Sequence, residues 1–433
     1  MNRTADAGLV RAIGLRRLTA SIVNLMVGAG IFVLPAIVAS EMGRAAPVAY
    51  VVCAGLMALI VTCFAAAGSR VSLTGGLYAY VEVAFGPLVG FIGGVLYMVM
   101  AAFAVATVAS ALAGSITAVW TAMATPLGRT ALLCLIFGTV ALVNVRGVTP
   151  GARLIEAVTV AKLLPLLLLV AVGVPSLRAD RVLVDHLPAA SLLGQSSLML
   201  IFVFEGIEIA LVPSGEIRNP SRTVPRAVYA GLAFTTLLYL AIQAVAQSIL
   251  GPSMADFSAA PLAEAAGRLL GSPGRTIVLA GAVVSMFGYV SGDMLSSPRA
   301  LFALGRDGIL PSAFAAVHPR FHTPQIAIAV YAIVVAGLAI SSSFNQLAIL
   351  ANVTALTLYL MCIAASWELQ RRDVRTDGAA PFVLPAGPLV PILAAIVTLW
   401  FLSHASRREF GVLALVLAVA SLLYFIRKTG GKI

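Results

Sequence analysis

One lysine and three carboxylates stand inside strongly apolar stretches of this sequence. Lys162 follows the apolar run 157–161 and is itself followed by Leu163-Leu-Pro-Leu-Leu-Leu-Leu-Val170. Glu205, Glu208 and Asp293 have comparably apolar surroundings. A charge in hydrocarbon is costly, so it is kept only where it has a partner or a task. These residues therefore indicate a site that binds or moves a charged group, and the alternative is that they only pair with one another.

The elements that must position these residues are membrane-spanning helices. Of the whole chain, 61% is hydrophobic and 10% is charged, against about 25% charged in soluble domains. The apolar runs are each about 20 residues long, which is enough to cross a bilayer. We predict an all-α integral membrane protein with one domain over residues 1–433 and twelve transmembrane helices. The predicted spans are 18–40, 47–69, 84–110, 130–145, 154–174, 194–215, 226–250, 276–304, 324–342, 345–367, 383–404 and 409–427.

The formal net charge of +11 describes topology rather than a nucleic-acid site. With an even number of spans, nineteen of the 28 Lys and Arg side chains fall on the side of the two termini and eight on the opposite side, besides Lys162 itself. Positive charge is enriched in cytoplasmic loops. We therefore expect a multi-pass protein of the cytoplasmic (inner) membrane with both termini in the cytoplasm, and no nucleic-acid partner.

Signatures of soluble catalysis are missing from the sequence. It contains no P-loop, no G-x-S-x-G and no spacing of His and Cys typical of a metal site. The four cysteines, Cys53, Cys63, Cys134 and Cys362, all fall within predicted spans, where cysteine usually serves as a small buried hydrophobe. We expect no enzyme activity, no cofactor and no bound metal.

Two of the predicted spans carry residues that interrupt a helix. The first contains Gly28-Ala29-Gly30 and Pro35, and the sixth contains Glu205-Gly206. Interrupted helices at corresponding positions, five spans apart, point to inverted repeats around a binding site at the middle of the membrane. Unwound backbone is tolerated at that depth only where it lines protein or a cavity.

Four segments give the chain a family resemblance. They are Val27-Gly-Ala-Gly-Ile-Phe32 in the first span, the stretch 73–87 after the second, 215–227 at the end of the sixth, and 299–311 at the end of the eighth, which is followed by His318-Pro-Arg and Thr323-Pro324. In this order and at these positions the chain resembles the amino acid–polyamine–organocation (APC) permeases, and the resemblance covers almost the whole sequence.

The resemblance implies a LeuT-like fold. Residues 18–174 would form the first inverted repeat, residues 194–367 the second, and residues 383–427 two further helices. It implies that the backbone of Val27, Gly28, Ala29, Gly30 and Ile31 holds a substrate carboxylate. The free amides at the start of a half-helix give a physical reason for this role. The substrate amino group would be held by the second break, at Glu205, Gly206 and Glu208, with Phe202 as an aromatic lid.

The resemblance also implies a role for Lys162. Sodium-independent and proton-driven members carry a lysine in the fifth span, in place of the sodium ion of related transporters. We expect its ammonium group to lie against carbonyl groups near Gly28 and against a hydroxyl of the eighth span, Ser285 or Ser291. Lys162 is thus a candidate proton carrier or cation mimic.

Two carboxylates depart from the family pattern. Glu205 and Asp293 stand where most amino acid permeases carry uncharged residues, whereas the position of Glu208 is often acidic or polar. Three carboxylates against one lysine leave an excess of negative charge. Either one of them takes up a proton, or a cationic substrate supplies the missing charge.

The sequence therefore favours a secondary transporter of amino acids that works by alternating access, as a proton symporter or an exchanger. The first alternative keeps the fold and changes the substrate to a polyamine or another cationic amine. A second alternative, from another class, is a membrane sensor that does not transport. The sequence leaves open which amino acid or amine is carried, and it indicates no oligomeric state.

Overall fold

A computed structural model of the chain describes residues 11, 13–147, 152–184, 187–258, 260–306, 310–375 and 380–429. In this part of the chain the protein is all-helical, and the only pairing of extended backbone is an isolated bridge between Ile13 and Ile217. Asp307, Gly308 and Ile309 of the eighth-span motif, and the two chain termini, lie outside the described residues.

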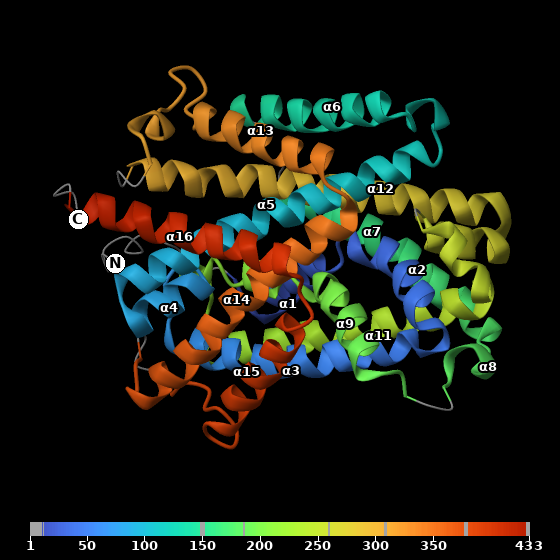
Figure 1. Cartoon of the computed structure of the whole chain (residues 1–433), viewed down its shortest axis with the longest axis horizontal. Coiled ribbons are helices and arrows are strands. Elements are labelled where there is room, and N and C mark those ends of the chain that lie inside the picture. The colour runs from blue at the N-terminus through green and yellow to red at the C-terminus, as the bar shows by residue number, and fades with distance from the viewer. Residues whose placement is uncertain are drawn as a thin grey trace.

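The long helices run side by side along the longest axis of the molecule (Figure 1). In chain order the α-helices are α1 (Leu15–Met26), α2 (Gly30–Met42), α3 (Ala46–Arg70), α4 (Leu77–Phe85), α5 (Pro87–Thr117), α6 (Pro126–Val145), α7 (Ala152–Gly173), α8 (Ala179–Val182), α9 (Ala190–Phe204), α10 (Ile207–Ala210), α11 (Pro220–Leu250), α12 (Pro261–Arg306), α13 (Gln325–Ser341), α14 (Phe344–Arg371), α15 (Leu389–Leu402) and α16 (Arg407–Thr429).

Eight helical segments of the described chain are long and apolar enough to cross a membrane, judged by length and composition. They are Gly30–Arg70, Pro87–Thr117, Pro126–Val145, Ala190–Ala210, Pro220–Phe257, Pro261–Phe302, Phe344–Arg371 and Arg407–Ile426. Three shorter apolar helices accompany them, Val160–Ser176, Gln325–Ser341 and Leu389–Leu402. The predicted count of twelve transmembrane helices stays a prediction.

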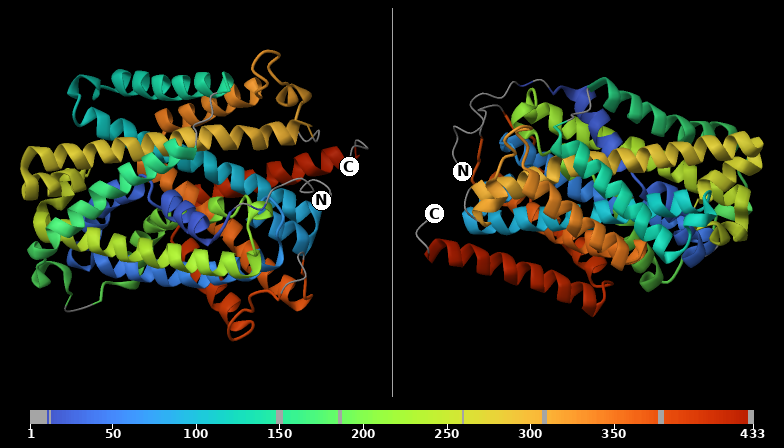
Figure 2. Two further views of the ribbon diagram at one scale, coloured as in Figure 1. Left: turned by 180° about the vertical axis from the view of Figure 1, so that it is seen from behind. Right: turned by 90° about the horizontal axis from the view of Figure 1, so that it is seen from above.

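The bundle has an inner and an outer set of helices. α3, α9 and α14 pack together and contribute many of the fully buried side chains, such as Phe64, Phe204 and Tyr359. α6 and α13 lie side by side on one flank, and α16 lies along the outside of the bundle in every view (Figures 1 and 2). Large apolar side chains on these outer helices are exposed, for example Leu135 and Ile333, as expected where the neighbour is lipid.

Several helices begin or end at other residues than the predicted spans, because prolines and glycines set the helix ends. The predicted third span divides at Gly86 (φ 88°) into α4 and α5, and α5 continues seven residues beyond the predicted end, to Thr117. α11 begins at Pro220 rather than at residue 226, since proline suits the first turn of a helix. α12 begins at Pro261 and is interrupted by non-helical backbone at Gly271 (φ 68°), and the predicted span 276–304 lies in the part after this interruption.

The two predicted interruptions are present. The first span ends as α1 at Met26 and resumes as α2 at Gly30, and the sixth ends as α9 at Phe204 and resumes as α10 at Ile207. α1 packs against α10 and α11. The Ile13–Ile217 bridge joins the entry of α1 to the chain that follows α10, through Ile13 N–H to Glu216 C=O (3.0 Å) and Arg218 N–H to Ile13 C=O (2.9 Å).

Candidate functional site

A small buried cavity lies where the two interrupted helices meet. About 20 Å³ of it is open to the centres of water molecules, which is room for about one water. It is bounded by the α1–α2 break, by the α9–α10 break, and by one residue each from α5 and α12. The lining residues are Leu25, Met26, Gly28, Ala29, Gly30, Val108, Phe202, Glu205, Gly206 and Tyr289.

Glycine allows the two breaks to approach this closely. Gly206 has φ 120°, and a Cβ there would lie 2.7 Å from the carbonyl carbon of Leu25 and 2.9 Å from the amide nitrogen of Met26. A Cβ on Gly30 would lie 2.6 Å from Cγ1 of Val203. Both contacts are closer than side chains tolerate, so a larger residue at either position would force the breaks apart.

Three amide groups at the start of α2 have no acceptors within the described residues, and two of them belong to residues that line the cavity. The first N–H groups of any helix lack intrahelical partners. Among the described hydrogen bonds, Phe32 N–H bonds to Ala29 C=O, and the amides of Ala29, Gly30 and Ile31 have no acceptor. α2 is thirteen residues long, so its N-terminal dipole adds to these donors and favours an anion.

The carbonyl groups at the end of α1 are, in contrast, satisfied by side chains. The ammonium group of Lys162 donates to Asn24 C=O and to Val27 C=O (2.8 Å for the latter). The hydroxyl of Tyr239 donates to Met26 C=O (2.7 Å), and that of Ser285 donates to Val27 C=O (3.3 Å). Of the two serines that the sequence left open, Ser285 is the one beside Lys162, and Ser291 makes no described hydrogen bond to this segment.

Two of the three carboxylates are well supplied with hydrogen bonds, the buried Glu208 and the half-buried Asp293. Glu208 accepts from the amide of Gly206 (2.8 Å) and from the hydroxyl of Tyr359 (2.9 Å), so it caps the break from inside. Asp293 accepts from the hydroxyls of Ser297 and Tyr331, at 2.7 Å each.

The third carboxylate is unpaired. Glu205 is only 7% exposed and lines the cavity, and its Oε1 atom is buried without a hydrogen-bond partner. An unsatisfied buried polar group is costly, and such groups call for a specific explanation. Glu205 is therefore the side chain of this site that most needs a ligand.

The buried charges do not neutralise one another directly. Within the described residues, no ion pair joins Lys162 to Glu205, Glu208 or Asp293. The ion pairs found there lie in loops and near helix ends, as between Arg70 and Asp373. Direct pairing thus does not account for the four buried charges.

The predicted site residues divide into two groups. Gly28, Ala29, Gly30, Phe202, Glu205 and Gly206 line the cavity. Phe202 is 8% exposed and packs edge-on against Phe344, with ring centroids 6.0 Å apart. The remaining predicted residues lie around the cavity rather than on its wall: Val27, Ile31, Glu208, Asp293, Lys162, Ser285 and Ser291.

Sequence reasoning missed several residues of the site. Tyr289 and Val108 line the cavity, and Tyr239 and Tyr359 bond to the two breaks. Tyr289 stands four residues after Ser285 and four before Asp293, so all three lie on one face of α12. That spacing was available in the sequence as a signal, whereas Val108 in a long apolar run gave none.

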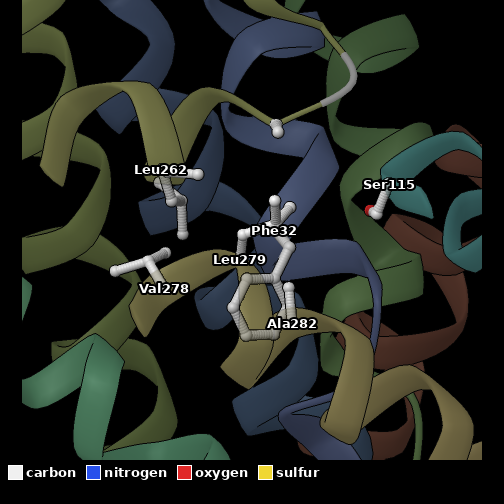
Figure 3. A pocket seen from close by; sticks show the side chains of 8 residues that line it. Phe32, Ser115, Leu262, Val278, Leu279 and Ala282 are labelled. Atoms are coloured by element: carbon white, nitrogen blue, oxygen red, sulfur yellow. The ribbon is translucent and has the colours of Figure 1, made fainter. Parts of the chain in front are cut away.

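A second cavity is smaller and apolar. About 10 Å³ of it is open to water centres, and it lies between α2, the end of α5 and the bent first part of α12. Phe32 and aliphatic side chains of α12, including Leu279 and Ala282, surround it (Figure 3). It holds no charged group, so it lacks the means to orient a polar ligand. Within the described residues, no cluster of His, Cys, Asp and Glu suits a metal ion either.

Comparison with known proteins decides the family. The profile of the amino acid permease family matches residues 13–425. The chain belongs to the amino acid permeases of the APC family. Among its curated relatives are two proteins of Bacillus subtilis. The serine/threonine exchanger SteT is 27% identical over 90% of each chain, and a methylthioribose transporter is 28% identical over 98% of this chain and 95% of its own.

A third relative has a basic substrate in its name. The L-lysine transport protein of Corynebacterium glutamicum is 30% identical over 72% of this permease and 65% of its own length. Together with the apolar helices, these matches make this permease a multi-pass membrane protein whose relatives are transporters.

Proposed function

We propose that this permease is a secondary active transporter that carries amino acids across the cytoplasmic membrane by alternating access. The observation that carries the proposal is the cavity between two interrupted helices, which has open backbone donors on one wall and an unpaired carboxylate on another. Amino acids present one anionic group, which suits the open backbone donors, and one cationic group, which suits the carbonyl end of α9 beside the cavity.

The carboxylate of the substrate would bind at the start of α2. The amides of Ala29, Gly30 and Ile31 have no acceptor within the described residues, and Gly28 leaves open space in front of them, since a Cβ there would meet only Leu25 and Tyr289, at 3.9 and 4.0 Å. Backbone amides and a helix dipole hold an anion without placing a full positive charge in the membrane.

The amino group of the substrate would bind at the end of α9. The last carbonyls of a helix have no intrahelical donors, and they carry the negative end of the helix dipole. Phe202, on the cavity wall in the last turn of α9, would cover the bound ligand.

Lys162 supports coupling that does not depend on sodium. Its ammonium group is 5% exposed and lies against two carbonyls of the first break, with the Ser285 hydroxyl on one of them. The carbonyls that turn outward at the first break need a positive charge close to them, and Lys162 supplies that charge without a bound ion. We infer proton-coupled symport or exchange, with Lys162 as the coupling residue.

The positions of the breaks favour a LeuT-like arrangement of twelve spans. α1–α2 opens the segment 18–174 and α9–α10 opens the segment 194–367, which is the pattern of inverted repeats. α15 and α16, in the segment 383–427, would be the two helices outside the repeats. The distribution of Lys and Arg favours both termini in the cytoplasm.

A cationic amine without a carboxylate is the second candidate substrate. Glu205 favours it, because an unpaired buried carboxylate attracts a cation whether or not that cation also carries an anionic group. The open amides of α2 argue against it, since such a ligand would leave them unused.

A ligand screen followed by uptake tests the proposal. Purified protein is heated with each of the twenty amino acids and with putrescine, spermidine and agmatine, and the ligands that raise its melting temperature are then tested for uptake into liposomes. We expect at least one amino acid to stabilise the protein and to be taken up with saturable kinetics. Stabilisation by amines alone would favour the second candidate, and binding without any uptake would favour a sensor.

A further inference from the structure

We propose that the substrate is an amino acid with a cationic side chain, and that the carboxylate of Glu205 is its counter-charge. This inference rests on the proposed function and narrows it to one substrate class. The juxtaposition that carries it is a buried, unpaired carboxylate on the wall of a cavity whose other polar groups already suffice for a neutral amino acid.

The first step compares the three carboxylates that stand in apolar helices. Glu208 has the amide of Gly206 and the hydroxyl of Tyr359, and Asp293 has two hydroxyls. Glu205 and Glu208 are both buried, Asp293 is half-buried, and of the three only Glu205 has a buried oxygen without a donor. Because the fold supplies donors to two of these carboxylates and withholds them from the third, the missing donor for Glu205 is expected from outside the protein.

The second step counts the charges of a bound ligand. A neutral amino acid has one carboxylate, which suits the α2 amides, and one ammonium group, which suits the carbonyl end of α9. It has no group left for Glu205, which would stay buried without a counter-charge. A ligand with one more ammonium or guanidinium group removes that penalty.

The third step concerns the walls of the cavity. The groups next to Glu205 are apolar or aromatic: Leu25, Met26, Val108, Phe202 and Tyr289. An alkyl stem packs well on such walls while its charged end reaches a carboxylate, and aromatic faces attract cations. These walls suit the stem and the head of a long basic side chain once the two breaks separate to admit it, since the cavity as it stands has room for about one water.

The fourth step extends the negative potential beyond the cavity. Tyr289 on the cavity wall stands four residues before Asp293, on the same face of α12. Asp293 is one turn further along α12 and has only neutral hydroxyls as partners among the described residues. No buried cation of the described chain is paired with either carboxylate. Both charges favour a cationic ligand over a neutral one.

The first experiment measures binding to the unmodified protein. Affinities of lysine and arginine are compared with those of leucine, serine and agmatine by calorimetry on the purified full-length chain. We expect lysine or arginine to bind at least about tenfold more tightly than either neutral amino acid. Equal or tighter binding of leucine or serine would overturn the inference and leave the proposed function standing. Binding of agmatine with no binding of any amino acid would instead overturn the proposed function.

The second experiment compares two isosteric variants. Glu205→Gln keeps the shape and removes the charge, and it should weaken lysine or arginine at least about tenfold relative to leucine. Glu208→Gln is the matched control, since Glu208 bonds to the Gly206 amide and to Tyr359 rather than lining the cavity. It should lower the affinity for lysine or arginine relative to leucine by a clearly smaller factor than Glu205→Gln does. If the affinity for lysine or arginine relative to leucine is unchanged in Glu205→Gln, the inference is contradicted. If that variant fails to fold, the affinities measured on the unmodified protein decide.

Discussion

At the scale of single residues, the ammonium group of Lys162 takes the place that water would have at an exposed helix end. The carbonyls of Asn24 and Val27 point away from α1 because the helix stops at Met26, and lipid offers them no donor. A charged donor is the strongest available, and its own burial is offset by these acceptors. The same contacts place a removable proton next to the segment that would hold the substrate.

Removing this ammonium group should therefore damage transport more than folding. For Lys162→Ala we expect uptake to fall at least about tenfold, because the first break loses a charged donor, and a hydrogen bond to a charged group contributes roughly 1.5–3 kcal/mol. Uptake and its pH profile are measured in liposomes, and the amount of folded protein in the membrane is measured alongside. Lys162 would have no part in the mechanism if the variant kept both the normal rate and the normal pH profile.

The two glycines of the first break differ in what surrounds them. A Cβ on Gly30 would collide with Val203 at 2.6 Å, whereas a Cβ on Gly28 would meet nothing closer than 3.9 Å. Gly30 is thus needed for packing of α2 against α9. Gly28 instead keeps the cavity open.

We predict that valine at either position abolishes substrate binding, with different effects on stability. Gly30→Val should destabilise the protein by about 1–3 kcal/mol through overpacking, while Gly28→Val should leave the melting temperature nearly unchanged. Gly138→Val on the exposed face of α6 serves as the control, since no atom lies within 4 Å of its Cβ position. Affinity like that of the unmodified protein in Gly28→Val would show that this segment does not hold the ligand.

At the scale of elements, the chain entering the first interrupted helix is tied to the chain leaving the second. The backbone bridge between Ile13 and Ile217 links the entry of α1 to the chain after α10, and the side chain of Arg218 also donates to Arg11 C=O (2.8 Å). α1 also packs directly on α10. These contacts favour motion of the two half-helices as one unit.

Ile13→Pro tests this coupling because it removes the N–H group that donates to Glu216 C=O. We expect the inner end of the bundle to open more often, so that a cysteine replacing Leu25 on the cavity wall reacts several-fold faster with a reagent added from the cytoplasmic side. Ile13→Val keeps the bridge and should react like the parent. Equal reactivity in all three would indicate that α1 and α10 move independently.

The sequence predicted the elements that carry the site better than the site itself. Gly28-Ala29-Gly30 and Glu205-Gly206 marked the two breaks, because glycine and a carboxylate are costly inside a membrane helix. Asp293 was grouped with the cavity from its apolar surroundings alone, and the structure places it one turn away, against Tyr331 of α13. Which side chains meet across helices depends on packing between distant segments, and no local pattern in one sequence contains that information.

At the scale of the whole molecule, the distribution of Lys and Arg predicts one orientation in the membrane, with both termini in the cytoplasm. Arg372 directly follows α14, which contains the tenth predicted span. Ser406 directly precedes α16 and lies between the eleventh and twelfth predicted spans. Both side chains are exposed. With the termini in the cytoplasm, the first lies inside and the second outside.

Cysteine labelling tests this orientation. Arg372→Cys and Ser406→Cys are made in a variant that lacks Cys53, Cys63, Cys134 and Cys362, and intact cells are treated with a thiol reagent that does not cross membranes. We expect Ser406→Cys to react in intact cells and Arg372→Cys to react only after the cells are opened. The reverse pattern would invert the topology, and reaction of both in intact cells would contradict the number of spans between them.

The central claim is that an amino acid binds between the two interrupted helices and is carried across the membrane there. Counterflow tests it most directly: liposomes that contain the protein are loaded with unlabelled amino acid, diluted, and supplied with a trace of the same amino acid in labelled form. The account predicts transient accumulation of label that saturates with substrate and disappears in Gly28→Val, while Gly138→Val behaves like the unmodified protein. Counterflow that persists in Gly28→Val, or its absence for every amino acid with the unmodified protein, would contradict it.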